Sequence, residues 1–315
     1  MIFMEITSFK ISAIIIEKDG QMEILCYGSL NIDYIYHVPH QIKPGETLSS
    51  RSLEKNPGGK GENQAAALAK AGCAVKMAGK IGKDGAFLLD ALKATGVDTS
   101  EVRVSDGFTG HAIIQLSDDG ENSIILFSGA NREQKEEEIR DAFSRIEEGS
   151  YLIIQNEINE LSYIIRCAKD KKMKIVFNPS PFDSSILSLP LNDIDILIVN
   201  EGEAAELAGL PENTDYERIL DKLRSDYNGS EVIMTVGKNG AFYQNKEERY
   251  YQPIINGPVV DTTAAGDTFA GYFIASRIRG YNPEKAMYYA TKASGIAVSR
   301  EGAMKSIPLA EEVFS

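Results

Sequence analysis

The segment with the clearest chemical potential is Asp-Thr-Thr-Ala-Ala-Gly-Asp at 261–267, which runs directly into an apolar stretch with helical spacing. Small residues let the backbone approach a ligand closely, and the following helix start presents unpaired amides and the positive end of its dipole. Such a site suits a phosphate group and the charge that develops during its transfer. The Asp267 carboxylate could accept a proton from an attacking hydroxyl. By spacing alone, an ordinary helix N-cap with an acidic first turn explains the segment equally well.

A second segment, Asn-Pro-Gly-Gly-Lys-Gly-Glu-Asn-Gln-Ala at 56–65, leads into an alanine-rich stretch. Three glycines in four residues again indicate close approach of the backbone to a ligand. The segment is not a P-loop, because no Gly-Lys pair is followed by Ser or Thr, and it is not a Gly-x-Gly-x-x-Gly fingerprint. A glycine-rich turn before a buried helix is the alternative interpretation.

Polar residues also follow two predicted strands. Asn31 and Asp33 come after the first strand, in Gly-Ser-Leu-Asn-Ile-Asp, and their alternation could direct both side chains to one side. Asn-Glu-Gly-Glu at 200–203 follows another strand and could order water around Mg²⁺, which usually keeps several waters. The alternatives are an Asx turn at the first position and an acidic helix cap at the second.

These segments lie between short β-rich runs that alternate with helical patterns. This alternation predicts an α/β fold, a Rossmann-like doubly wound and mostly parallel sheet with helices on both faces. The predicted strands are 23–27, 75–78, 151–155, 174–177, 194–200 and 232–236. The predicted helices are 59–71, 86–94, 161–170, 265–279 and 283–298, together with one that starts near 201.

Two regions break the alternation and predict a small β-sheet lid. One, 32–54, has β-type residues around a Pro44-Gly45 turn, and the other, 108–128, reads as two strands around a polar turn. The predicted main domain is then formed by 22–31, 55–107 and 129–315. Residues 1–21 are expected to be an N-terminal extension of unknown role.

Composition excludes several classes of protein. The chain of 315 residues has 43% hydrophobic and 25% charged residues, which is ordinary for a globular protein. A net charge of −13 without a basic cluster argues against nucleic-acid binding. The isolated Cys26, Cys73 and Cys167 indicate free thiols in a reducing compartment. No apolar run approaches the ~20 residues of a membrane span, so a cytoplasmic location is expected.

In this order, the segments resemble the PfkB, or ribokinase-like, family of carbohydrate kinases from about residue 22 to 308. The family's first signature resembles 58–65 and its second resembles 261–267. Further similarity lies in Thr-Val-Gly-Lys-Asn-Gly at 235–240, Asn-Pro-Ser-Pro at 178–181, and 297–303 with Ser306. The resemblance implies the α/β domain and β-sheet lid expected above, and an ATP-dependent sugar kinase.

The resemblance also implies roles for individual residues. Asp267 would be the general base for the sugar hydroxyl, and the amides of Ala264, Ala265 and Gly266 would form an anion hole. The sugar would contact Asn31, Asp33, Gly59, Lys60, Asn63, Glu157 and Asp267. ATP would contact Asn200, Thr235, Gly237, Gly240, Gly266 and Thr291.

Two metal ions and a second subunit are implied in the same way. Glu203 would help to position Mg²⁺ through water. A monovalent cation, usually K⁺ in these kinases, would be held by Asp261, Thr263, Ala297, Arg300, Gly302 and Ser306. A homodimer formed through the lid is a further expectation, because an exposed lid sheet offers strand edges for pairing.

The resemblance favours D-ribose as the acceptor, with D-ribose 5-phosphate and ADP as products. Lys60 and Glu157 favour a small free pentose, although deoxyribose, a ketose or a nucleoside stay open as alternatives. A non-catalytic sugar- or nucleotide-sensing protein is expected to lack the base or the anion-hole glycine, and both are present. Two residues depart from the family pattern: Glu62 stands where a small residue is usual, and His111, expected on the lid surface, where an apolar one is usual.

Overall fold

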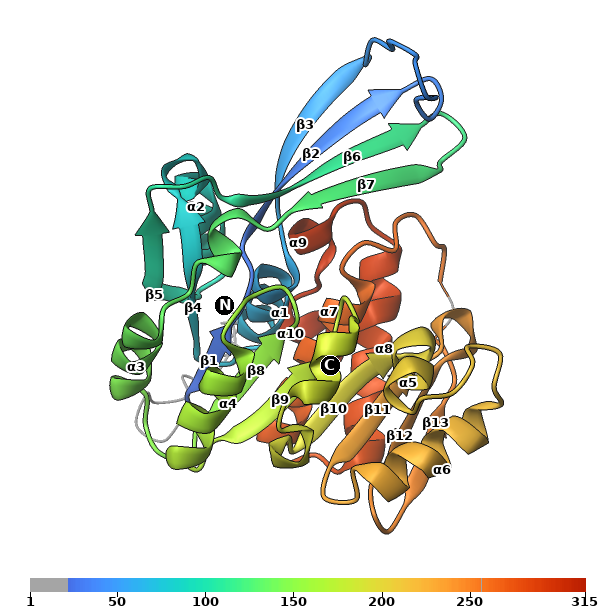
Figure 1. The fold of residues 1–315 in the computed structure, drawn as a ribbon. Coiled ribbons are helices and arrows are strands. Elements are labelled where there is room, and N and C mark those ends of the chain that lie inside the picture. The colour runs from blue at the N-terminus through green and yellow to red at the C-terminus, as the bar shows by residue number, and fades with distance from the viewer. Residues whose placement is uncertain (1–21, 256) are drawn as a thin grey trace, which may run out of the picture.

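The computed structural model describes residues 22–255 and 257–315, so the predicted extension at 1–21 lies outside the described residues. Within the described ranges the strands form a nine-stranded sheet, in the order β13-β12-β11-β10-β9-β8-β1-β4-β5, and a separate four-stranded sheet (Figure 1). The large sheet contains β1 (Ile24–Tyr27), β4 (Val75–Gly82), β5 (Asp98–Ser105), β8 (Tyr151–Gln155), β9 (Lys174–Asn178), β10 (Ile196–Asn200), β11 (Glu231–Thr235), β12 (Ala241–Gln244) and β13 (Arg249–Gln252).

The neighbouring strands β5, β4, β1, β8, β9, β10 and β11 of the large sheet are parallel to one another. Strands β12 and β13 add an antiparallel hairpin at one edge. The predicted fold class, a mostly parallel sheet with helices on both faces, is therefore confirmed. The sequence pattern missed β5 and the hairpin. The β5 segment, Asp-Thr-Ser-Glu-Val-Arg-Val-Ser, is an edge strand with several exposed residues, so it lacks the apolar run that marks the central strands.

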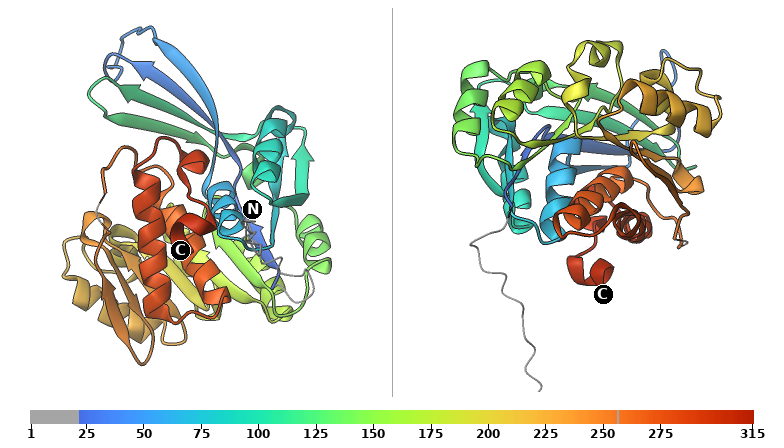
Figure 2. Two further views of the ribbon diagram at one scale, coloured as in Figure 1. Left: turned by 180° about the vertical axis from the view of Figure 1, so that it is seen from behind. Right: turned by 90° about the horizontal axis from the view of Figure 1, so that it is seen from below.

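Helices cover both faces of this sheet, as the view from below shows (Figure 2). One apolar cluster packs under α1 (Lys60–Lys70), α2 (Ala86–Ala94), α7 (Ala265–Ile278) and α8 (Pro283–Val298). The other packs under α3 (Glu136–Ser144), α4 (Leu161–Asp170), α5 (Glu201–Leu207) and α6 (Tyr216–Asp226). The short helices α9 (Ala303–Ser306) and α10 (Ala310–Phe314) close the chain.

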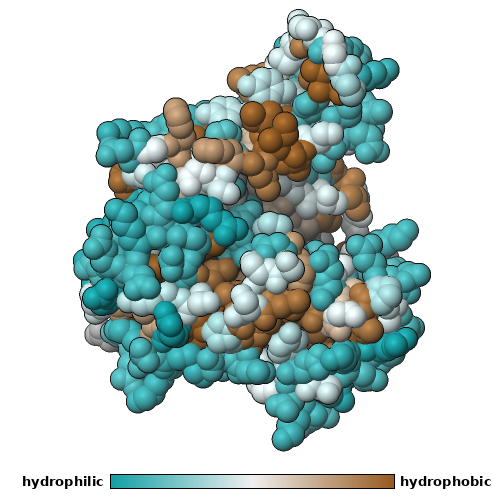
Figure 3. All heavy atoms as spheres, in the orientation of Figure 1, coloured by the Kyte–Doolittle hydropathy of each residue, from teal (hydrophilic) through white to brown (hydrophobic). Residues whose placement is uncertain are grey.

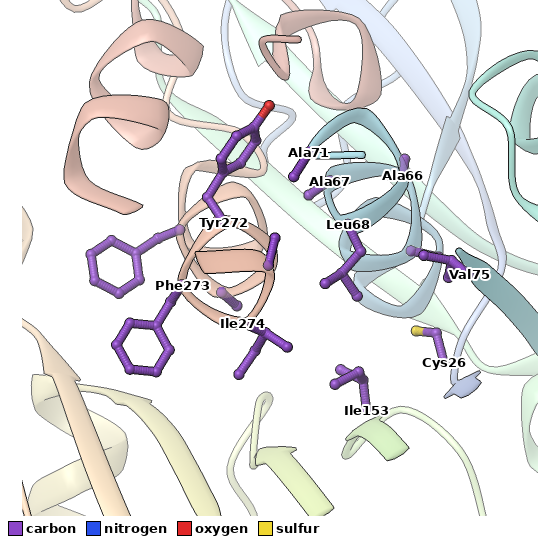
Figure 4. Close-up of a cluster of buried hydrophobic side chains, with 14 of the residues drawn as sticks. Cys26, Ala66, Ala67, Leu68, Ala71, Val75, Ile153, Tyr272, Phe273 and Ile274 are labelled. Carbon is purple, nitrogen blue, oxygen red and sulfur yellow. The ribbon is translucent and has the colours of Figure 1, made fainter. Parts of the chain in front are cut away.

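The contact between α1 and α7 is unusually close because small residues face each other. Ala67 and Leu68 of α1 lie opposite the α7 segment that carries Tyr272 and Phe273 (Figure 4). A Cβ atom added to Gly271 would lie 2.5 Å from the Cβ of Ala67, so this position of α7 accepts no side chain without movement. Asn63 and Asp267 each lie one turn before these contact residues, so the packing brings both to one place.

The four-stranded sheet projects from the main domain and forms the predicted small β-sheet (Figure 1). It contains β3 (Ser52–Gly58), β2 (Asn31–Val38), β6 (Gly110–Ser117) and β7 (Asn122–Phe127), in that order. The central pair β2·β6 is parallel, whereas β2·β3 and β6·β7 are antiparallel. We call this sheet the lid. At its base, Asn31 of β2 faces Gly58 of β3.

The lid presents apolar surface. All residues of the edge strand β7 are exposed, and Ile124, Ile125, Leu126 and Phe127 are the large apolar ones among them. Figure 3 shows a hydrophobic patch over this part of the molecule. His111 of β6 is half-buried, with its ring centroid 5.0 Å from that of Phe127 and 5.9 Å from that of Tyr34.

Candidate active site

Polar residues end four consecutive parallel strands of the large sheet. They are Gln155 of β8, Asn178 of β9, Asn200 of β10 and Thr235 of β11. Gln155 is in register with Asn178, and Asn200 with Thr235. Because the carboxyl ends of parallel strands share one edge of a sheet, these side chains form a polar row where ligands bind in open α/β folds. The row identifies this edge as the candidate active site.

Asp267 lies buried at the start of α7, next to α1. Its Oδ1 accepts a hydrogen bond from the Gln64 side chain at 2.9 Å, and its Oδ2 accepts one from the Asn63 side chain at 3.3 Å. The side chain of the predicted base is therefore held between two amides from the second turn of α1. Each carboxylate oxygen keeps a further lone pair to accept a proton or a hydroxyl.

Gln64 belongs to a set of buried amides that the sequence did not single out. The Gln155 amide donates to the Gln64 side-chain oxygen at 2.7 Å, and the Gln64 amide donates to both Asp267 and Asn178. Asn178 in turn donates to the Ile198 carbonyl at 2.7 Å. A signal was available, since an amide in an alanine-rich buried helix must find a polar partner. Which partner it finds depends on the packing of α1 against the sheet.

Lys60 and Glu157 lie on the same side of α1. Glu157 accepts hydrogen bonds from the Lys60 backbone amide, at 3.0 Å, and from the Ser29 hydroxyl, so one of its oxygens caps the helix. Burial lowers the pKa of the Lys60 ammonium, but the carboxylates of Asp267, Glu157 and Glu203 outweigh burial and raise that pKa. Lys60 is therefore a cation on which the charges of three acids act.

Asn31 and Asp33 project from the base of the lid. The Asn31 side-chain oxygen accepts a hydrogen bond from Asn131 at 2.7 Å, which orients the amide. Asp33 packs against Gly58, where an added Cβ would lie 2.1 Å from a carboxylate oxygen. Burial raises the pKa of Asp33 to about 7, and the negative charge of Glu157 adds to this effect. Asn131 was not predicted, and its role as a partner of Asn31 depends on a contact across 100 residues.

The backbone amides of the predicted anion hole, 264–266, differ in their hydrogen bonding. Ala264 caps the helix with a left-handed backbone, φ 59°. The Ala265 amide donates to the Thr262 carbonyl at 3.2 Å, so it is engaged within the turn. The Gly266 amide has no acceptor among residues 22–255 and 257–315, and a Cβ there would meet open space. Gly266 therefore provides a free amide at the positive end of the α7 dipole.

Two adjacent cavities collect the residues predicted to contact the nucleotide. One, of about 390 Å³, is lined by Gly240, Gly266, Thr291 and apolar residues such as Ile254 and Phe269. The other, of about 810 Å³, is lined by Asn200 and by the acidic residues Glu201, Glu212 and Asp215. Thr235 and Gly237 line both cavities. The apolar cavity, which contains Gly266, therefore adjoins the polar one at these two residues.

The donor set near Asp261 fits a monovalent cation. Its Oδ1 accepts hydrogen bonds from the Thr263 amide and hydroxyl, and its Oδ2 accepts one from the Gly302 amide at 2.9 Å. Burial raises the pKa of Asp261, but these hydrogen bonds outweigh burial and lower it, so the carboxylate stays anionic. The other predicted ligands, Ala297, Arg300 and Ser306, lie on or beside the Gly302 loop. Carboxylate, hydroxyl and carbonyl oxygens suit a hard cation such as K⁺.

Glu203 offers one carboxylate for a magnesium ion. Glu203 is buried and forms a capping box with Asn200. The Asn200 backbone amide donates to the Glu203 carboxylate at 3.0 Å, and the Glu203 backbone amide donates to the Asn200 side-chain oxygen at 2.8 Å. No group of three acidic, His or Cys side chains arranged for a metal occurs in the described part of the chain. A single carboxylate is compatible with Mg²⁺, which is often held by one or two carboxylates together with phosphates and water.

None of the helices in the described part of the chain has the length and apolar content of a membrane-spanning segment.

Comparison with known proteins identifies the family. Residues 21–310 match the pfkB family of carbohydrate kinases. The chain is 35% identical over 299 residues to a ribokinase of Haemophilus influenzae, covering 91% of this chain and 95% of that protein. It is 29% identical to a deoxyribokinase of Salmonella typhi, covering 92% and 97% of the two chains. The structure of Arabidopsis thaliana ribokinase complexed with ribose and ATP superposes with a TM-score of 0.82, at 31% identity, covering 93% and 98%.

The match spans nearly the whole chain, so the chain belongs to the pfkB family of carbohydrate kinases and is a sugar kinase that uses ATP as co-substrate.

Proposed function

We propose that this kinase is a ribokinase that transfers the γ-phosphoryl group of ATP to the 5-hydroxyl of D-ribose, with Asp267 as the general base. The observation that carries the proposal is the position of Asp267. Its carboxylate is bound to Asn63, a proposed sugar contact, and it is adjacent in sequence to Gly266, whose free amide lies in the nucleotide cavity. A base at this junction can reach a sugar hydroxyl and a phosphate at once.

The proposed reaction needs little covalent help from the protein. Asn31, Asp33, Gly59, Lys60, Asn63 and Glu157 bind and orient the sugar. Asp267 takes the proton of the sugar 5-hydroxyl. The sugar oxygen then forms the new bond to the γ-phosphorus while the bond from this phosphorus to ADP breaks. The Gly266 amide and the α7 dipole stabilise the negative charge that develops on the transferred group.

The cations are part of the proposal. Mg²⁺, held by Glu203 through water, would neutralise phosphate charge, and K⁺ at Asp261 and the Gly302 loop would add positive potential beside the anion hole. The protein's own contribution is to fix the loop. Asp261 joins the start of the α7 loop to the Gly302 loop through the hydrogen bond to the Gly302 amide.

We propose that the lid, 32–54 and 108–128, closes over the sugar while the remaining described residues form the catalytic domain. Strands β2 and β3 bring Asn31, Asp33 and Gly58 to the base of the lid. Closure would exclude water, which otherwise competes with the sugar as acceptor.

The sugar assignment is tested by a coupled assay of ADP release with D-ribose, deoxyribose, fructose, ketodeoxygluconate and nucleosides, with and without K⁺. We expect the highest kcat/KM with D-ribose and faster turnover with K⁺, because the polar groups at the lid base and around Lys60 suit a small free pentose. Deoxyribose lacks one hydroxyl of ribose, so it would leave a hydroxyl-binding group of the site unpaired. This unpaired group should lower kcat/KM for deoxyribose. Highest kcat/KM with deoxyribose, a ketose or a nucleoside would refute the ribose assignment.

We also propose that two copies associate through their lids. Strand β7 is an edge strand with four consecutive exposed apolar residues, a combination that favours pairing with another chain. Light scattering should give twice the mass of the chain, and Ile125→Glu should shift the protein to a monomer. Val104→Glu, an exposed apolar position outside the lid, is the matched control and should stay dimeric. A monomeric wild-type protein at assay concentrations contradicts this proposal.

A further inference from the structure

Glu62 is a buried carboxyl group without a partner. It lies in the first turn of α1, its side chain is fully buried, and neither carboxyl oxygen has a hydrogen-bond partner among residues 22–255 and 257–315. A buried, unpaired carboxylate is costly, and an unpaired neutral carboxyl still loses the hydrogen bonds that water would supply. A partner for Glu62 in another state of the protein would remove this cost.

The charge that acts on Glu62 is that of Asp33, which comes from strand β2 of the lid. Lys60, two residues earlier on α1, lies instead among Asp267, Glu157 and Glu203. On β3, Gly58 contributes backbone only, and the Asp33 carboxylate packs against it. The Glu62 amide donates to the Ser29 carbonyl at 2.9 Å, in the loop that leads to Asp33, so the two acids lie in the same region at the base of the lid. Neither acid forms an ion pair in the described part of the chain.

This arrangement determines which acid carries a proton. Burial raises the pKa of Glu62 well above its ordinary value, and the negative charge of Asp33 raises it further. The pKa of Asp33 is about 7, whereas the raised pKa of Glu62 favours its protonated form. A neutral carboxyl beside a carboxylate is a hydrogen-bond donor facing an acceptor. No hydrogen bond joins Glu62 to another described residue in this structure.

We propose that Glu62 is a positioning residue for the sugar site: when the lid closes over the sugar, its carboxyl proton bonds to Asp33. That bond fixes the Asp33 carboxylate, which keeps its remaining lone pairs for sugar hydroxyls. The closed state thereby supplies the partner that the buried Glu62 lacks here. The inference rests on the proposed sugar site, and it concerns binding of the sugar rather than transfer of the phosphoryl group.

Two substitutions test it by calorimetric titration with the sugar that the wild-type enzyme uses best. Glu62→Gln keeps the shape and an N–H donor, so sugar affinity at neutral pH should stay within a few-fold of wild type. Glu62→Ala removes the donor and should weaken sugar binding by about 10-fold or more, the scale of a hydrogen bond to a charged group. KM for ATP should not change, because the nucleotide cavities do not include this residue.

The dependence of sugar affinity on pH distinguishes hydrogen-bond donation by Glu62 from simple packing of its side chain. Because the folded pKa of Glu62 is raised, its proton is retained to higher pH than that of an ordinary Glu and is lost as the pH rises through the raised pKa. Wild-type affinity should therefore fall on the alkaline side of a pH series, where this proton is lost. Glu62→Gln should lose this alkaline decrease and keep the acidic decrease that protonation of Asp33 causes.

Glu54→Gln on β3, an exposed carboxyl of the lid, is the matched control and should bind sugar like wild type. Wild-type affinity in Glu62→Ala, or an unchanged alkaline decrease in Glu62→Gln, overturns the inference. If Glu62→Ala fails to fold, the isosteric Glu62→Gln variant carries the test alone. Failure of the proposed function is a separate outcome, because it would appear in the wild-type protein itself, as highest kcat/KM with an acceptor other than D-ribose or as no turnover of any sugar.

Discussion

Asp267→Asn should lower kcat by roughly 10²–10⁴-fold, the usual scale for loss of a general base. The asparagine side chain occupies the same space, but it cannot accept the proton of the sugar hydroxyl. The side-chain amides of Asn63 and Gln64 both donate to the present carboxylate. The NH₂ group of the new asparagine would therefore place a donor opposite one of these donors. KM for ATP should change less, because the apolar part of the nucleotide cavity does not include Asp267.

The measurement is kcat and KM for both substrates in the coupled ADP assay. Asp90→Asn, an exposed acid on α2, is the matched control and should keep wild-type turnover. A value of kcat for Asp267→Asn close to that of the wild-type enzyme would show that another group takes the proton. Unchanged kcat with a raised KM for the sugar would leave Asp267 as a binding residue only.

Gly271→Ala should reduce activity although Gly271 touches neither proposed substrate site. The added Cβ would lie 2.5 Å from the Cβ of Ala67, so α7 must move away from α1. Overpacking of this kind costs about 1–3 kcal/mol, whereas replacing a helical glycine by alanine recovers only about 0.5–1 kcal/mol. The net effect is a loss of stability together with displacement of Asp267 from Asn63 and Gln64.

Displacement of a catalytic group by about 1 Å can lower a rate roughly 10²-fold, so kcat should fall by more than the loss of stability explains. The test combines thermal unfolding with kcat measured well below the melting temperature. Gly229→Ala is the matched control, because an added Cβ there has no neighbour within 4 Å. Wild-type kcat in folded Gly271→Ala would mean that the two helices can separate without moving the base.

The sequence predicted the fold well where its elements carry apolar runs. The predicted helices 86–94 and 161–170 and the strand 151–155 agree with α2, α4 and β8 at both ends. Helices α3 and α6 were missed because each presents a narrow apolar side on a mostly charged surface, as in Glu-Glu-Glu-Ile-Arg-Asp at 136–141. Their burial depends on the sheet that they cover, which a local pattern does not contain.

The candidate site was predictable in its residue types and less so in its contacts. Asn63 and Asp267 were placed in the site from the two glycine-rich segments, and the structure brings their side chains together. Gln64 is in the same segment, but its role in the site was not predicted. Its hydrogen bonds to Asp267 and Asn178 exist only after α1 packs on the sheet. The engagement of the Ala265 amide by Thr262 likewise depends on a turn geometry that residue types do not specify.

The base of the lid has a mechanical consequence. Asn31 and Gly58 face each other where β2 and β3 leave the main domain, and Asp33 is two residues farther along β2. A rotation of the lid therefore turns about the same few residues that are proposed to hold the sugar. If the lid rotates as proposed, its axis would pass close to the proposed sugar site, so a shift of a fraction of an ångström at the sugar would become a larger displacement at the far end of β2.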